Sequence, residues 1–123
     1  LAKQGKYGGA EPLYKRALAI REETLGPRHL DVAESLNKLA LLLASQGKYD
    51  DAQPLYQLAL AIREETLGSR HLDVASSLNN LALLLVSQSK YGDAEPLYKR
   101  ALAIREETLG PRHPDVISSL VHL

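Results

Sequence analysis

Apolar residues along this chain recur three and four positions apart, which is the spacing of one face of an α-helix. One apolar stripe begins at Val32 and a second begins at Tyr49, with the polar turn Gln46-Gly47-Lys48 between them. The first stripe consists of Val32, Leu36, Leu39, Ala40 and Leu43. The second consists of Tyr49, Ala52, Leu55, Tyr56, Ala59, Ile62 and Thr66. The pattern therefore predicts two amphipathic helices joined by a short turn.

Residues that start and stop helices divide the rest of the chain in the same way. Gly68 ends one predicted helix, and Asp73 stands where an N-cap would accept a hydrogen bond from the first free backbone amides. Asp31, followed three residues later by Glu34, has the spacing of a capping box. Pro54, like its counterparts Pro12 and Pro96, is interpreted as a helix-start marker. These signals predict helices at about 9–25, 31–46, 51–67, 73–88, 93–109 and 115–123.

The two-helix unit recurs with a period of 42 residues. Residues 2–43 and 44–85 differ at nine of 42 positions, so 33 are identical, and residues 86–123 form a partial third copy. Such units cannot bury their apolar face alone and must stack on their neighbours. We therefore expect a single repeat array that is a fragment of a longer one.

Differences between the copies fall outside the apolar stripes. Glu11 and Lys15, an i,i+4 pair, are replaced by Gln53 and Gln57 in the next copy. Glu34 and Lys38 are replaced in the same way by Ser76 and Asn80. Paired changes four residues apart are typical of ion pairs on a solvated helix face.

Composition excludes several classes of function. Lys plus Arg and Asp plus Glu each total 15, so the basic excess typical of nucleic-acid or acidic-membrane binding is missing. The absence of cysteine excludes disulfides, thiolate metal sites and cysteine nucleophiles, and leaves the redox compartment undetermined. The longest apolar runs are far below the roughly 20 residues of a membrane span. No signal peptide is visible, and we expect a cytoplasmic protein.

Three recurring motifs have a chemical and a structural interpretation. His-x-Asp recurs at His29, His71 and His113, but each copy offers two metal ligands where zinc needs three or four, so an interhelix loop is favoured. Arg-Glu-Glu recurs at Arg21, Arg63 and Arg105; adjacent helix residues point about 100° apart, so a solvated face is favoured over acid–base chemistry. The tyrosines are expected to pack between helices. We predict no enzyme, no metal and no cofactor.

The residues of the second helix resemble a known family. Ala52, Tyr56 and Ala59, preceded by Gly47-Lys48-Tyr49, look like the second helix of a tetratricopeptide repeat (TPR). The 42-residue period with LNNLALLL, GKY, AEPLYKRALAIREETLG and HPDV is similar to the kinesin-light-chain subtype of that repeat. HEAT or armadillo repeats, which share the period range, are the alternative fold.

This resemblance implies an all-α, right-handed superhelical solenoid of antiparallel helix pairs, with first helices that line a concave groove for a partner protein or peptide. The groove residues carried over from the family are Glu34, Asn37, Lys38, Leu41, Ser45, Ser76, Asn79, Asn80, Leu83, Ser87, Ser118, Val121 and His122. In kinesin light chains an Asn-Asn pair of this helix faces cargo, and Asn79-Asn80 matches that pair in full. The basic clamp of chaperone-docking members is not reproduced.

Two functions remain open at this point. The first is a scaffold that binds a peptide or partner protein in the groove. The second is a structural, self-assembling module, because the chain opens at Leu1 and closes at Leu123 without a capping repeat. For that case we predict head-to-tail stacking, a heterologous contact that does not close on itself.

Overall fold

The computed structural model describes residues 4–110 and 114, and for residues 4–9 it describes the backbone alone. Five helices make up the regular structure of this part: α1 (Gln4–Leu25), α2 (Leu30–Ser45), α3 (Tyr49–Leu67), α4 (Leu72–Ser87) and α5 (Tyr91–Leu109). The predicted helix at 115–123 lies outside the described residues. Helix order and type agree with the prediction, but α3 and α5 begin two residues earlier than expected and α1 begins five residues earlier.

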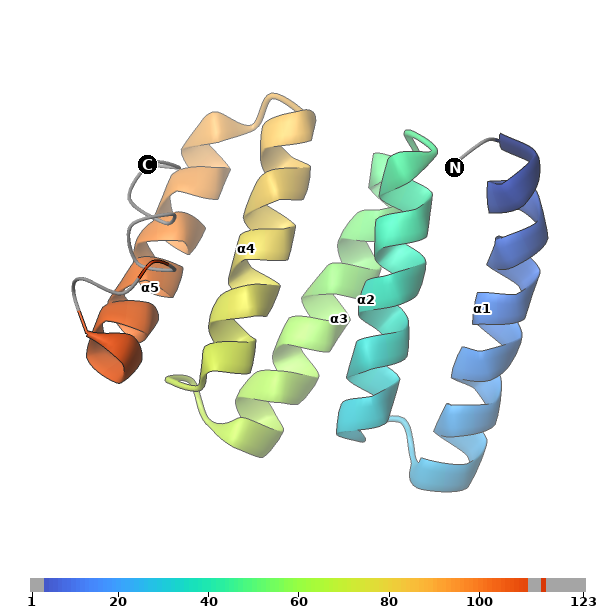
Figure 1. The fold of residues 1–123 in the computed structure, drawn as a ribbon, viewed down its shortest axis with the longest axis horizontal. Helices are drawn as coiled ribbons and strands as arrows, with labels where there is room; N and C mark the ends of the chain where they lie inside the picture. The colour runs from blue at the N-terminus through green and yellow to red at the C-terminus, as the bar shows by residue number, and fades with distance from the viewer. Residues whose placement is uncertain (1–3, 111–113, 115–123) are drawn as a thin grey trace. The chain divides into compact units, whose positions relative to one another are not determined.

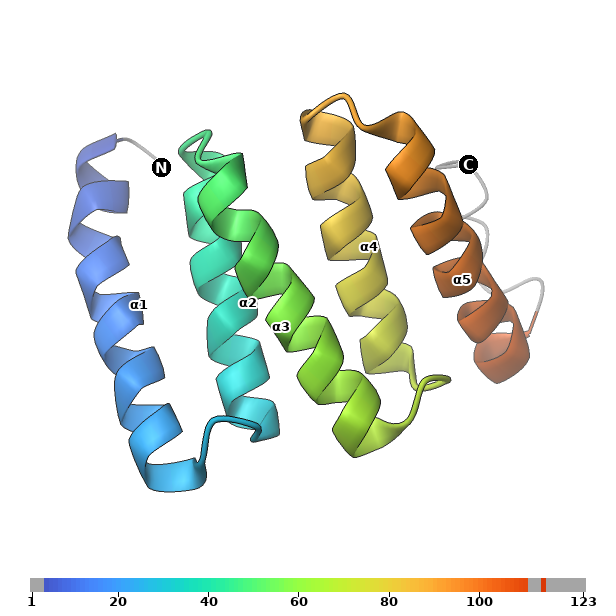
Figure 2. The same ribbon diagram turned by 180° about the vertical axis from the view of Figure 1, so that it is seen from behind.

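The chain folds into two compact units, Leu1–Ile62 and Arg63–Leu123. In the first unit, α1 and α2 run side by side in opposite directions (Figures 1 and 2). In the second unit, α4 and α5 form a closely packed antiparallel pair.

The first unit has a core built from the predicted stripes. Val32, Ala33 and Leu36 of α2 pack against Ala59 and Ile62 of α3, and all five are buried. Leu18 of α1 and Leu55 of α3 cover the edge of this cluster. The same positions on α4, Val74, Ala75 and Leu78, are fully buried. Thr66, which the pattern placed on the second stripe, is exposed in the last turn of α3.

Histidines, not aspartates, cap α2 and α4, and this corrects the predicted N-caps. The Nδ1 atom of His29 accepts a hydrogen bond from the backbone N–H of Asp31 at 3.0 Å, and His71 does the same for Asp73. Each histidine has extended backbone angles, which leaves the following residue free to begin the helix. Asp31 and Asp73 instead lie in the first turn, where a carboxylate is favoured by the helix dipole.

Left-handed backbone conformations end the helices. Gly68 follows α3 with φ of +90°, which confirms the predicted stop. In the turn between α2 and α3, Gly47 has φ of +79°, and the N–H of Lys48 donates to the carbonyl of Leu43 at 2.9 Å. The equivalent residue between α4 and α5 is Ser89, with φ of +62°.

Candidate functional site

The predicted groove residues of α2 lie on the side of the helix that is not buried. Leu41 is 61% exposed, although its neighbours Leu39 and Leu42 are buried. Glu34, Lys38 and Ser45 are exposed, and Asn37 is half-buried and holds an interaction within the chain.

The equivalent residues of α4 form a second face of the same kind. Leu83 is 49% exposed between buried leucines. Ser76 and Ser87 are exposed, and the Oγ of Ser87 donates to the carbonyl of Leu83 at 3.1 Å. Asn79 and Asn80 are both half-buried, and Asn79 holds an interaction within the chain. The remaining predicted groove residues, Ser118, Val121 and His122, lie outside the described residues.

The two faces differ in charge because the substitutions between the copies fall on them. On α2, the carboxylate of Glu34 lies 3.7 Å from the ammonium of Lys38, which confirms the predicted i,i+4 pair. On α4, Ser76 and Asn80 occupy these two positions, so that face is neutral and rich in amides. The α2 face therefore suits a charged ligand group better, whereas the α4 face offers amides that donate and accept hydrogen bonds at once.

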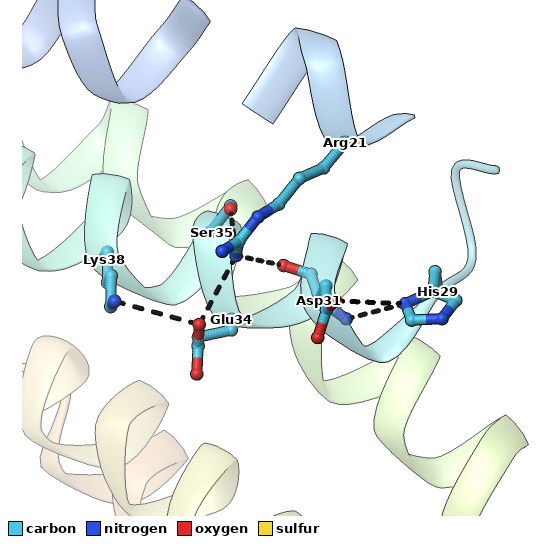
Figure 3. Close-up of polar contacts among 6 residues, drawn as sticks. All are labelled: Arg21, His29, Asp31, Glu34, Ser35 and Lys38. Atoms are coloured by element: carbon cyan, nitrogen blue, oxygen red, sulfur yellow. Dashed lines mark hydrogen bonds and ion pairs between the residues drawn. The ribbon is translucent and has the colours of Figure 1, made fainter. Parts of the chain in front are cut away.

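An arginine of α1 connects the α2 face to the preceding helix (Figure 3). The Nη1 atom of Arg21 donates to Ser35 Oγ at 2.9 Å, to the carbonyl of Asp31 at 3.0 Å and to Glu34 Oε1 at 3.3 Å. Ser35 is buried, so this hydrogen bond satisfies a hydroxyl that would otherwise be costly to bury.

The arginine contact recurs in the second unit. Arg63 Nη1 donates to Ser77 Oγ at 2.9 Å and to the carbonyl of Asp73 at 3.3 Å, and Ser77 is buried. The sequence interpretation of Arg-Glu-Glu as a solvated face agrees with the exposure of Glu23 and Glu65, but it missed these contacts of the half-buried Arg21 and Arg63. The signal that could have revealed their role is a serine at a buried helix position, beside Leu36 and Leu78.

A small pocket opens between α1 and α2 in the first unit. Its volume is about 130 Å³, and it is lined by Tyr14, Ala17, Arg21, Ser35 and Lys38. Two cationic side chains, Arg21 and Lys38, reach it, and the single carboxylate of Glu34 contacts both of them, so one of the two positive charges is compensated.

Of the three tyrosines at the repeat position of Tyr14, Tyr56 and Tyr98, two pack as predicted. Tyr56 and Tyr98 are 5% exposed, and burial raises the pKa of each hydroxyl above its ordinary value of 10.0. Tyr14, at the same repeat position on α1, is 39% exposed, and Tyr91 at the start of α5 is 63% exposed. The prediction that the tyrosines pack between helices is therefore wrong for these two.

Neither a metal cluster nor a membrane span is found in the described residues. No group of three or more His, Asp or Glu side chains there could hold a metal ion. Within the same part of the chain, no helix is both long and apolar enough to cross a bilayer.

Comparison with solved structures gives close matches over nearly the whole chain. BtubC (BKLC) from P. vanneervenii is 30% identical, with a TM-score of 0.88 over 97% of this chain and 48% of that protein. A Podosopora anserina protein described as a putative kinesin light chain with nearly identical TPR-like repeats is 27% identical, with a TM-score of 0.88 over 99% of this chain and 58% of that protein. A substituted form of the same protein is also 27% identical, with a TM-score of 0.87, and the match covers 99% of this chain and 57% of that one.

The chain thus spans about half the length of the solved structures that it matches. No curated protein matches the sequence. The tetratricopeptide repeat family matches over residues 1–65, 32–107 and 73–123, so its pattern extends over the whole chain. The predicted all-α, TPR-like solenoid fold and the kinesin-light-chain-like subtype are confirmed. The chain belongs to the tetratricopeptide repeat family.

Proposed function

We propose that the chain is a binding scaffold, not an enzyme, and that partner proteins or peptides bind the exposed faces of α2 and α4. Tetratricopeptide repeats generally mediate protein–protein interaction. The observation that supports this location is the pair of exposed leucines, Leu41 and Leu83, at the same position of two repeats and flanked in each by buried leucines. An apolar side chain surrounded by hydrogen-bonding groups is the arrangement that fixes a peptide side chain and its backbone together.

Asn80 and Leu83 are the best residues for testing this proposal. Leu83 supplies apolar contact area, and Asn80 lies one turn away on the same side of α4. Asn79 belongs to the same predicted pair, but its interaction within the chain means that its replacement also affects stability.

A peptide selected from a random linear library displayed on phage would serve as the probe. We expect Leu83→Asp to weaken its binding by about 30-fold or more, and Asn80→Ala by about fivefold, the effect of one hydrogen bond. Tyr91→Asp is the matched control, because Tyr91 is an exposed apolar residue of α5 outside the proposed face. Fluorescence anisotropy gives the affinities and thermal melts check the fold. Unchanged affinity in the Leu83 and Asn80 variants would show that this face does not bind.

The variant Leu41→Asp tests whether the α2 face also binds the same peptide. A peptide that contacts both faces should lose affinity with Leu41→Asp and with Leu83→Asp. A peptide that contacts α4 alone should lose affinity only with the second variant.

The second candidate function is self-assembly, and one observation favours it. Among the side chains of α1 that the structure describes, four large apolar ones are exposed, namely Leu13, Tyr14, Ile20 and Leu25. Sedimentation velocity over a range of concentrations tests this candidate, which predicts a mass that rises with concentration.

A further inference from the structure

Helix α3 differs from α1 and α5 in having no charged residue along most of its length. Residues 52–62 read AQPLYQLALAI, whereas the equivalent stretches of α1 and α5 both read AEPLYKRALAI. Gln53, Gln57 and Leu58 thus stand where the other two helices have glutamate, lysine and arginine. All other residues of the stretch are identical, including those that α3 buries. The three replacements therefore change the surface of α3 and leave its core residues unchanged.

Four residues on this surface have the arrangement that accepts a side chain from another helix. Residues three and four apart are neighbours on a helix, and four such neighbours border the hole that receives a side chain when helices pack. On α3 these four residues, the α3 hole, are Pro54, Gln57, Leu58 and Ala61. Ala61 is half-buried and the other three are exposed, Leu58 by 37%. The α3 hole therefore contains one large apolar side chain with the shorter side chains of Pro54 and Ala61 on either side.

The equivalent surface of α5 is unsuited to packing against a copy of itself. There Lys99 and Arg100 take the places of the glutamine and the leucine. Lys99 forms an ion pair with Glu95 at 3.7 Å, and Arg100 forms one with Glu64. Two copies of such a surface would place cations against cations and would remove their ion pairs from water, which is costly. The α3 hole has neither obstacle.

We propose that α3 binds α3 of a second copy of this chain across a two-fold axis, with Leu58 of each copy inserted into the α3 hole of the other. The contact is isologous, because each copy supplies both the leucine and the hole. An uncharged surface suits this occupant, since no charge is buried and the two Gln57 amides can each donate and accept a hydrogen bond. Stable interfaces use about 20–30 residues a side, so we expect a weak dimer with a Kd of about 0.1–1 mM.

This dimer goes beyond the proposed function. It uses no residue of the α2 and α4 faces, and it would present two copies of each face to a partner. A partner with two binding segments would then gain affinity because its second binding event occurs within one complex.

Cysteine cross-linking tests the contact directly, because the chain has no cysteine of its own. Gln57→Cys places one thiol per chain at the border of the α3 hole, and a two-fold contact brings two such thiols together. The matched control is Lys99→Cys, at the equivalent exposed position of α5. With a short bismaleimide we expect about tenfold or more covalent dimer from the first variant than from the control, because the thiols of a dimer react within one complex. Equal yields would overturn the contact.

Leu58→Arg provides a second test and restores the residue that α1 and α5 have at this position. Two facing arginines should weaken association by at least about 30-fold, as expected at the centre of an interface. Leu83→Asp, which removes an exposed leucine of α4, is the control and should associate like the parent. Sedimentation velocity measures mass, and far-UV circular dichroism checks that each variant is helical.

Three outcomes of these measurements would contradict the dimer. A parent chain that is monomeric at about 1 mM would overturn it, since a millimolar contact would then be half-formed. Association that persists in Leu58→Arg but is lost in Ile20→Asp would overturn it and leave self-assembly through α1 intact. A monomeric parent whose Leu58→Arg variant loses the phage-selected peptide would assign the α3 hole to that peptide instead.

Discussion

Helices α1 and α5 contain the same sequence in different surroundings. Residues 10–26 and 94–110 are identical at all 17 positions, from AEPL to ETLG. In α5, which packs against α4, Tyr98 and Ile104 are each 5% exposed; in α1, Tyr14 is 39% and Ile20 is 51% exposed. One amphipathic pattern thus gives a buried face in one place and an open face in the other. The pattern specifies the helix and its apolar side, and the neighbouring helix decides whether that side is covered.

Truncating the same tyrosine in the two helices gives the largest expected difference. Tyr98→Ala should lower the free energy of unfolding by about 3–5 kcal/mol, the usual cost of removing a buried aromatic ring. Tyr14→Ala should cost roughly 1 kcal/mol, because much of its surface remains in water. Urea unfolding at low micromolar concentration measures both. Equal costs would show that the α1 face is covered in solution.

Amide hydrogen exchange should show a smaller difference. Identical sequences have nearly the same intrinsic exchange rates, so the two segments can be compared directly. We expect amides of α1 to exchange about tenfold faster than their counterparts in α5, because fewer apolar contacts oppose local opening. Mass spectrometry needs fragments that include Gly9 or Asp93, since fragments within the identical segment have the same mass. Equal protection would contradict the comparison.

The smallest effects are expected at the two ends of the pH–stability curve, where Glu11 of α1 contributes at the acid end and Tyr98 of α5, together with Tyr56 of α3, contributes at the alkaline end. A hydrogen bond from Lys15, at 2.9 Å, and the charges of Lys15 and Lys48 lower the pKa of Glu11 on α1 below its ordinary 4.5. The associated stability is present above pH 4.5 and is lost as the pH falls through the lowered pKa. Burial raises the pKa of Tyr98 on α5, so its contribution is present below pH 10.0 and is lost as the pH rises through the raised value.

Two substitutions test the acid limb and the alkaline limb of the pH–stability curve separately. Glu11→Gln should flatten the acid limb alone, and Tyr98→Phe the alkaline limb alone, so each variant is the control for the other. Melting temperatures between pH 3 and pH 11 provide the measurement. A Glu11 variant that alters only the alkaline limb would contradict the assignment.

Most of the fold could be predicted from the sequence because it depends on local patterns. The 42-residue period, the apolar stripes and the glycine after each second helix define the helices and most of the core. Helix starts were predicted less well. Aspartate is a common N-cap, but here His29 and His71 take that place with Nδ1 as acceptor, and no spacing rule separates the two choices.

The candidate site was predicted in part. The α2 and α4 residues could be assigned to the uncovered side of their helices, because Leu41 and Leu83 fall off the apolar stripe. The contacts of Arg21 and Arg63 were missed, because they join residues 14 positions apart across two helices and the only local sign of them is a serine at a buried helix position. The pattern also did not predict the exposure of α1, because the apolar pattern of α1 is the same as that of α5.

The turn that precedes α5 makes the two hairpins unequal in conformational energy. Ser89 occupies the left-handed backbone region that Gly47 occupies in the turn between α2 and α3. A side chain in that region costs roughly 1 kcal/mol. The equivalent position of the other turn already has the residue that avoids this cost, because glycine has no side chain. Placing the glycine of the earlier turn at position 89 would relax the later one and even out the energies of the two repeats.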